Sequence, residues 1–369
     1  MEPIFCPLRA KALFILLIFF YNGLGMNKKN LLLLSIGGIM IFSTLFLLRE
    51  ADIEDATLGK RFEKDFREQE KKTEILFVGD VMLDRGVEYY SEQAGDIFYP
   101  FQKISSFLAE GDIVICNLEG TIVQDPPYFG PHSYNFAFKK ETAAALSSAN
   151  VNLASLANNH THDMGKEGIR ETKQILEENN IGFLGDPVVC DQELSFKKDD
   201  IVFFAANKTF PFNCSDGEVA SQIRDLKRMY PQKLLVTIFH WGHEYHDVNS
   251  PFQEKLARLA IDSGSDLVVG HHPHVVQNIE QYKDKLIFYS LGNFIFDQDF
   301  SEETKQGLTV KMTTGPKNLV FNLSPVNIEK GQPSLMSPEQ KQEFLSKLAQ
   351  RSNPGLMDSI NEGIISVKR

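Results

Sequence analysis

Cysteine and positive charge are both scarce in this sequence of 369 residues. It has four cysteines and no C-x-x-C pair, which argues against a disulfide framework and a cysteine-type zinc site. Lys and Arg number 38 against 49 Asp and Glu, giving a formal net charge of −11. This balance excludes a broad basic surface, so no nucleic acid is expected as a partner. An anionic substrate then needs a local device, such as a metal ion or a single arginine.

The few cysteines leave one alternative open. Cys6 precedes the apolar N-terminal segment described next, and the other three follow it. Of these three, Cys190 and Cys214 could form one disulfide in an oxidising compartment. They could equally be small buried side chains with free thiols.

A long apolar run near the N-terminus predicts a membrane anchor. Residues 31–48 (LLLLSIGGIMIFSTLFLL) carry no charge. At ~1.5 Å rise per residue they cover ~27 Å, close to the hydrocarbon thickness of a bilayer. Lys28 and Lys29 precede the run, which places its N-terminal end in the cytoplasm. No clear cleavage motif follows. We therefore expect a single-pass protein of the cell membrane, with its domain outside the cytoplasm.

The residues before this anchor have two interpretations. Residues 1–25 hold another apolar run, interrupted by Lys11. Met26 is followed by a short basic stretch and then by the anchor, an arrangement typical of a natural start. Residues 1–25 are therefore either an over-extended start or an extra apolar segment.

The rest of the chain divides into three parts. Residues 49–73 are rich in charge and poor in aromatic residues, which predicts a helical or partly disordered stalk. Residues 74–330 are expected to form the main domain. Residues 331–369 are expected to be a C-terminal extension with a helix near residues 338–351.

Short apolar runs alternate with helix-like stretches in the main domain. Such runs suit strands buried on both faces, and their alternation with helices predicts a layered α/β fold. In these folds ligands collect beyond the carboxyl ends of the strands. The predicted strands are residues 75–78, 112–116, 151–157, 201–205, 234–239, 266–269 and 286–289, and the predicted helices are 167–178 and 252–263.

Histidines gather at the ends of these predicted strands. A lone histidine is more often a surface or core residue than a ligand, but three clusters at strand ends favour a metal site. In the last cluster, His272 and His274 form a His-x-His pattern that suits a strand or extended loop, where alternate side chains share a face. The clusters are His160 and His162; His240, His243 and His246; and His271, His272 and His274.

Carboxylates and amides follow other predicted strands. Asp80 follows the first strand, Asn117 and Glu119 follow the second, and Asn159 directly precedes His160. Oxygen and imidazole ligands without cysteine suit a hydrolytic Zn, Mn or Fe centre, with one or two divalent ions. The predicted metal ligands are Asp80, Asn117, Glu119, Asn159, His240, His272 and His274.

Three residues near these ligands are predicted to take part in catalysis: His160, Asp163 and Arg85. A divalent ion acidifies bound water and polarises a phosphoryl or carbonyl oxygen. His160 could then protonate the leaving group, with Asp163 orienting its ring. Arg85 either grips an anionic group of the substrate or forms an ordinary salt bridge.

Six motifs, in their order along the chain, resemble the bacterial CapA family of capsule-synthesis or poly-γ-glutamate-synthesis proteins. The resemblance covers about residues 74–310. It implies a calcineurin-like metallophosphatase fold, a four-layer β-sandwich flanked by helices, in a membrane-anchored protein that faces outward. The motifs are Gly79–Leu83, Asn117–Glu119, Ala157–His160 with Asp163 and Gly165, His240–Gly242, Gly270–His274 and Tyr289–Phe294.

The resemblance also implies roles for single residues. Metallophosphatases begin with Asp-x-His, but this chain has Asp80-Val81-Met82, so one ligand to the first metal is missing. By position, Asp80 resembles the first metallophosphatase aspartate, and Glu119 or Asn117 stands near the bridging carboxylate. Asn159 and His160 resemble the Asn-His pair. His240 resembles the single histidine, and His272 with His274 the terminal His-x-His.

Two functions follow as hypotheses. The first is a membrane-tethered, metal-dependent hydrolase or transferase of capsule or envelope polymer assembly. It would act on an anionic polymer or a phosphoester through phosphoester or γ-glutamyl chemistry. The alternative is a non-catalytic accessory subunit that works with other capsule synthase subunits, which the missing histidine supports. An intracellular nucleotidase, a third hypothesis, conflicts with the predicted anchor.

Overall fold

The structure is a computed structural model that describes residues 72–130, 133–191, 194–209 and 214–369. The predicted segment 1–25, the anchor 31–48 and nearly all of the stalk 49–73 lie outside the described residues. Among the residues described, no helix combines the length and the apolar character needed to cross a membrane.

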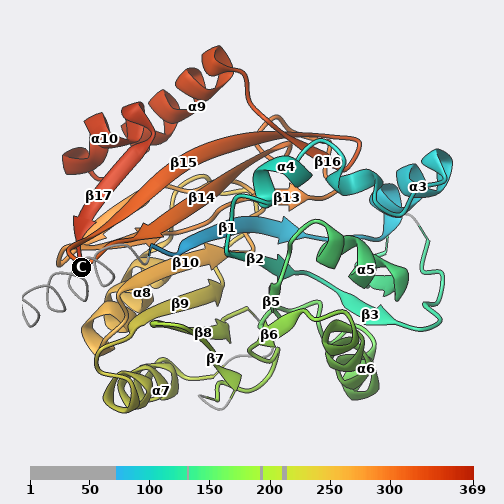
Figure 1. Ribbon diagram of the computed structural model, residues 1–369, viewed down its shortest axis with the longest axis horizontal. Coiled ribbons are helices and arrows are strands. Elements are labelled where there is room, and N and C mark those ends of the chain that lie inside the picture. Colours follow the sequence, from blue (N-terminus) through green and yellow to red (C-terminus); the bar gives the residue numbers. More distant parts are fainter. Residues whose placement is uncertain (1–71, 131–132, 192–193, 210–213) are drawn as a thin grey trace, which may run out of the picture. The chain divides into compact units, whose positions relative to one another are not determined.

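Strands and helices are interspersed up to residue 271, and residues 279–335 then form six consecutive strands (Figure 1). The strands are β1 (Glu74–Val81), β2 (Ile113–Leu118), β3 (Thr121–Val123), β4 (Ala137–Lys139), β5 (Leu153–Ser155), β6 (Gly182–Leu184), β7 (Phe196–Lys198), β8 (Ile201–Asn207), β9 (Leu234–His240), β10 (Leu267–His271), β11 (Ile279–Tyr282), β12 (Lys285–Phe288), β13 (Asn293–Ile295), β14 (Gln306–Thr314), β15 (Asn318–Glu329), β16 (Gln332–Leu335) and β17 (Ile364–Lys368). The helices are α3 (Arg85–Ala94), α4 (Ser105–Leu108), α5 (Glu141–Ser148), α6 (Gly165–Glu178), α7 (Asp216–Met229), α8 (Pro251–Ser263), α9 (Pro338–Arg351) and α10 (Met357–Glu362), with 3-10 turns η1 (Tyr99–Phe101) and η3 (Pro354–Leu356).

Every strand and helix predicted within the described residues is present. The seven predicted strands correspond to β1, β2, β5, β8, β9, β10 and β12, and the predicted helices to α6, α8 and α9. Continuous burial along β1, β2, β8 and β9 explains why apolar runs were a sufficient signal there.

Two large sheets organise the described residues. A nine-stranded sheet runs in the order β16-β15-β14-β1-β2-β5-β6, with β13 beside β1 and β17 beside β15. A six-stranded sheet runs in the order β11-β12-β10-β9-β8-β7. The central pairs β1–β2 and β9–β10 are parallel, so their carboxyl ends lie at one edge of each sheet.

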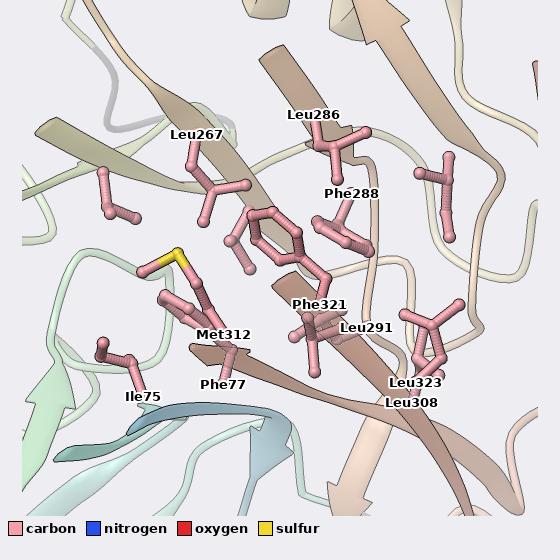
Figure 2. Packing of buried hydrophobic residues seen from close by; sticks show 14 of the residues in the cluster. Ile75, Phe77, Leu267, Leu286, Phe288, Leu291, Leu308, Met312, Phe321 and Leu323 are labelled. Atoms are coloured by element: carbon pink, nitrogen blue, oxygen red, sulfur yellow. The ribbon is translucent and has the colours of Figure 1, made fainter. Parts of the chain in front are cut away.

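The main core lies between these two sheets. Ile75 and Phe77 of β1 face it, together with Leu267 of β10 and Phe321 of β15 (Figure 2). Because side chains alternate along a strand, Leu76 and its alternate neighbours on β1 face the opposite side. Apolar side chains from both sheets therefore form one continuous interior.

Helices cover the outer face of each sheet. Residues of α5 and α6 pack with β1, β2 and β5 in a second cluster, and residues of α7 and α8 pack with β8, β9 and β10 in a third (Figure 1). The protein is thus a mixed α/β fold with the layer order helices, sheet, sheet, helices. This order agrees with the four-layer sandwich implied by the family resemblance.

The C-terminal segment belongs to the same sheet and core. Residue 330 lies in the turn between β15 and β16, and β17 pairs antiparallel with β15. Leu345 of α9 and Ile360 of α10 are buried in the core between the sheets. Residues 331–369 therefore contain two strands of the nine-stranded sheet in addition to the helix expected there.

Candidate metal centre

The carboxyl ends of the parallel strands bring the predicted ligands together. Strand register places Asp80 beside Asn117 in one sheet and His240 beside His271 in the other. Asn293 of β13 flanks Asp80 on its other side. All five side chains are buried, so long-range strand pairing gathers polar groups inside the protein.

A close approach of two backbones fixes the position of Asp80. The Asp80 N–H donates to the carbonyl oxygen of Gly292 at 2.9 Å. A Cβ atom on Gly79 would lie 2.1 Å from that same oxygen, and Gly292 has a φ of +67°. Glycine at both positions therefore lets β1 pass directly beside the start of β13.

Four donors surround the Asp80 carboxylate. The amide Nδ2 of Asn117 and the ring Nδ1 of His271 lie 2.9 Å and 3.1 Å from Oδ1. The backbone N–H of His272 and the ring Nδ1 of His274 each lie 3.3 Å from Oδ2. Burial alone would raise the pKa of Asp80, but hydrogen bonds and charge from His271 and His274 hold it well below its usual value. Asp80 is therefore a buried anion.

The His-x-His segment is a turn, not the strand or extended loop predicted for it. His272 has a φ of +96° and His274 a φ of +56°, both in the left-handed region. β10 ends at His271, and the Tyr245 N–H donates to the Pro273 carbonyl at 2.8 Å. The two imidazoles reach the centre because the backbone turns. The prediction that they share a face through strand alternation was therefore wrong. Residues held in this region without glycine are often found at functional sites.

Two groups of side chains have the spacing of metal ligands. Glu119, His272 and His274 bring ligand atoms within 4.8 Å of one another, and so do Asp80, Glu119 and His240. Among the described side chains, Oε1 of Glu119 and Nδ1 of His272 are buried atoms that lack a hydrogen-bond partner. Buried polar atoms normally have a hydrogen-bond partner, so these two atoms indicate an ion-binding site. Carboxylate and imidazole donors fit a Zn, Mn or Fe ion.

The protonation of the cluster follows from burial and neighbouring charge. Burial, with the charge of Asp80, raises the pKa of Glu119 well above its usual value. Burial lowers the pKa of His274, but the charges of Glu119 and Asp80 outweigh it and raise that pKa to about 9. Burial, with the charge of His274, lowers the pKa of His272 to about 3. Burial likewise lowers the pKa of His240. His240 and His272 are therefore neutral imidazoles.

The predicted ligands Asn117 and Asn159 both lie in the cluster. Nδ2 of Asn117 lies 3.2 Å from Nδ1 of His240, and Oδ1 of Asn159 lies 2.6 Å from Nε2 of the same ring. The two amides thus contact both nitrogens of His240. This contact accounts for the orientation of the ring.

His160 and Asp163 form the expected pair at the edge of the cluster. Nδ1 of His160 lies 2.9 Å from Oδ2 of Asp163, which also accepts the Phe136 N–H at 2.7 Å. The ring packs on Phe136, with the centroids 4.2 Å apart. Its other nitrogen, Nε2, lies 3.9 Å from Oε1 of Glu119. One side of the imidazole is therefore held while the other faces the cluster.

Arg85 lies beside this pair and forms a salt bridge. Its guanidinium pairs with Asp297 and lies over the rings of Phe136 and Phe296, at 4.8 Å and 5.8 Å from their centroids. Its Nε is buried and has no partner among the described residues. The structure thus shows the salt bridge that was one of the two interpretations. The shared contact with Phe136 keeps Arg85 close to His160.

Four further residues of the site are not among the predicted ligands and catalytic residues. His271 contacts Asp80, Asn293 contacts Nδ1 of His274 at 3.0 Å, and Asn158 donates to Asn117 at 3.1 Å. The ring of Tyr245 stacks on His274 with centroids 6.2 Å apart. His271, Asn158 and Asn293 stand within the recognised motifs. The motifs therefore mark these three residues in the sequence, but they do not indicate which side chains the three contact.

Comparison with known proteins assigns the family. The model of the family described as bacterial capsule synthesis protein PGA_cap matches residues 74–192 and 192–298, well over half of the chain. The chain belongs to this family. The matched PGA_cap region contains every predicted site residue, from Asp80 to His274.

Relatives of this PGA_cap protein carry names from capsule, PGA and polyglutamine synthesis. The chain is 30% identical to the capsule biosynthesis protein CapA of Bacillus anthracis, over 82% of this chain and 79% of that protein. It is 29% identical to the PGA biosynthesis protein CapA of Bacillus subtilis, over 75% and 78%. It is 24% identical to a probable polyglutamine synthesis accessory protein of Mycobacterium tuberculosis, over 61% and 74%.

A solved structure provides a more distant likeness. The purple acid phosphatase PPD1 of yellow lupin seeds matches with a TM-score of 0.34 and 12% identity, over 73% of this chain and 53% of that one. A likeness this distant says nothing of the activity, which has to be argued from the site.

Proposed function

We propose that this PGA_cap protein is a metal-dependent hydrolase or transferase in the synthesis of a poly-γ-glutamate capsule or related envelope polymer. The observation that carries the proposal is the buried group Glu119, His272 and His274, with its two unpartnered ligand atoms, beside the His160–Asp163 pair. The polymer class is taken from the family and from the names of the Bacillus relatives.

The chain supplies binding and proton transfer around the ion. A divalent ion held by this group provides Lewis-acid chemistry toward a phosphoryl or γ-glutamyl carbonyl group. His160, oriented by Asp163, is placed to donate a proton from Nε2 to a leaving group. Arg85, fixed by Asp297, adds a positive charge for an anionic part of the substrate.

The variant His160→Asn tests the catalytic proposal. We expect its turnover to fall by about 100-fold, the low end of what general acid catalysis contributes, with an unchanged metal content. Full-length protein loaded with Mn²⁺ would be assayed on poly-γ-glutamate and on an aryl phosphoester. The variant His246→Asn, an exposed histidine outside the cluster, serves as the matched control. Wild-type protein that turns over neither substrate, or an unaffected His160→Asn, would contradict the proposal.

The alternative is an accessory subunit of a polymer synthase. Met82 stands where metallophosphatases have a histidine, and the relative from M. tuberculosis is named a probable accessory protein. Capsule complementation distinguishes the two functions. Full restoration of the capsule by a His160→Asn protein that still binds metal would favour the accessory role. Co-purification with other capsule synthase subunits would then identify its partners.

The proposed location is the outer face of the cell membrane. Its support is the apolar run at residues 31–48 and the disulfide between Cys190 and Cys214, whose Cα atoms lie 6.0 Å apart. Disulfides persist mainly in oxidising compartments, so the bonded pair fits an exported domain.

Protease treatment of intact spheroplasts tests this location. We expect external protease to digest the domain of the membrane-bound protein without lysis, because the domain faces outward. A co-expressed cytoplasmic protein that stays intact is the control. A domain protected until the cells are lysed would rule out this topology.

A further inference from the structure

We propose that the side-chain amide of Asn117 fills one of the two candidate ion positions, so that this chain holds a single metal ion at Glu119, His272 and His274. The inference rests on the proposed metal-dependent function and specifies its ion count. The sequence predicted Asn117 as a metal ligand. In this proposal Asn117 is instead a hydrogen-bond donor that occupies the position of an ion.

Three acceptors converge on the amide nitrogen of Asn117. Nδ2 lies 2.9 Å from Oδ1 of Asp80, 3.3 Å from Oε2 of Glu119 and 3.2 Å from Nδ1 of His240. These acceptors belong to the same three residues that form the second candidate ligand group. The partial positive charge of the amide therefore lies where an ion held by that group would be.

Backbone contacts determine which end of the Asn117 amide faces the cluster. Oδ1 of Asn158 accepts the backbone N–H groups of His160 at 3.1 Å and Thr161 at 2.9 Å, so its Nδ2 faces the other way. That Nδ2 donates to the Leu118 carbonyl at 2.8 Å and to Oδ1 of Asn117 at 3.1 Å. The oxygen of Asn117 is thereby committed to Asn158. Its nitrogen faces the three acceptors.

Rotating the Asn117 amide would be unfavourable. The rotation would place N–H groups against N–H groups at Asn158 and an oxygen against two carboxylates. Both asparagines are fully buried, so no solvent compensates for the lost hydrogen bonds. Asn117 therefore cannot present its oxygen to an ion without breaking this network.

In the second group, His240 and Asp80 already use their polar atoms in hydrogen bonds. Nδ1 of His240 faces a donor on Asn117, so it accepts, and Nε2 carries the hydrogen and donates to Oδ1 of Asn159 at 2.6 Å. The two oxygens of Asp80 face four donors, described above. Neither side chain has a free position for an ion.

The first group is left with its ligand atoms available. Nδ1 of His274 lies 3.0 Å from Oδ1 of Asn293 and 3.3 Å from Oδ2 of Asp80, so it carries a hydrogen. Metal-binding histidines commonly donate in this way through their second nitrogen. Nε2 of His274 lies 3.6 Å from Oε1 of Glu119, which has no hydrogen-bond partner within the described chain. Nδ1 of His272, in the same group, likewise has no hydrogen-bond partner among the described residues.

Counting the ions tests the inference directly. Full-length protein in detergent would be loaded with Mn²⁺, freed of loosely bound ions by gel filtration and measured by elemental analysis and electron paramagnetic resonance. We expect about one Mn²⁺ per chain and the spectrum of an isolated ion. Two ions per chain with a spin-coupled spectrum would overturn the inference, and so would a protein without bound metal.

The variant Asn117→Asp tests the role of the amide. A carboxylate at this position removes the donor and adds a ligand, so we expect about two Mn²⁺ per chain and spin coupling. The control is Asn152→Asp, at the opposite end of β5, where Oδ1 accepts the Val114 N–H and an aspartate can do the same. It should keep one ion. A folded Asn117→Asp protein that still binds one ion would refute the role of the amide. If the variant does not fold, the number of Mn²⁺ ions bound by the wild-type protein tests the inference.

The outcomes separate this inference from the proposed function. A single ion without turnover of either substrate class would contradict the hydrolase and leave the ion count intact. Turnover by a protein that contains two coupled ions would contradict the ion count alone.

Discussion

Replacing Asp80 by asparagine is expected to lower the free energy of unfolding of the metal-free protein by about 3–5 kcal/mol, the usual cost of removing one partner of a buried charged pair. Two imidazoles, an amide and a backbone N–H all point at this carboxylate. Asparagine keeps one acceptor oxygen and turns the other into a donor. The variant therefore loses the charge that faces His274 and sets N–H groups against N–H groups.

The single tryptophan provides the measurement. Trp241 is fully buried and donates from Nε1 to the Tyr289 carbonyl at 2.8 Å, so its fluorescence reports unfolding in urea. Asp96→Asn is the matched control, because Asp96 accepts the Phe98 N–H and the Gln102 side chain in an exposed loop. That control should change stability by no more than about 0.5 kcal/mol. Equal losses in the two variants would show that Asp80 does not organise the site.

Much of the fold and part of the site could be predicted because the signals are local. Buried parallel strands appear as continuous apolar runs, as in β1 and β9, and the polar residue that ends each strand is read directly from the sequence. Parallel pairing then brings Asp80 beside Asn117 without further information. The pairing of His160 with Asp163 was also predictable, since the two residues are close in sequence.

The features that were missed depend on distant contacts. The orientation of Asn117 is set by Asn158, and the left-handed turn at His272 and His274 is held by a backbone contact with Tyr245. β17 pairs with β15 as a short strand that is buried only on alternate residues, so no long apolar run marks it. Sequence patterns indicate which residues end a strand, but not which atom of an amide faces the centre.

Metal affinity is expected to fall at least about tenfold for each pH unit below 9. Nearby carboxylates raise the pKa of His274 to about 9, so this imidazole is protonated in the metal-free protein at neutral pH. A ligand must lose its proton before it binds an ion, and each competing proton costs about tenfold in affinity per pH unit. The raised pKa of Glu119 adds a second proton that competes with the ion. Affinity thus rises with pH, and the span from pH 9 to 6 corresponds to about 1000-fold or more.

Calorimetric titration of the full-length protein with Mn²⁺, in buffers of different ionisation enthalpy, measures both the affinity and the protons released. The variant Glu244→Gln removes one of the acidic neighbours that raise the pKa of His274, so its affinity should begin to fall at a lower pH than in the wild type. His246→Asn, at the exposed histidine outside the cluster, should follow the wild-type curve. A constant affinity between pH 6 and 8 would mean that His274 is neutral in the free protein. In that case the neighbouring carboxylates would not hold a proton on the cluster, and the ion would bind without displacing one.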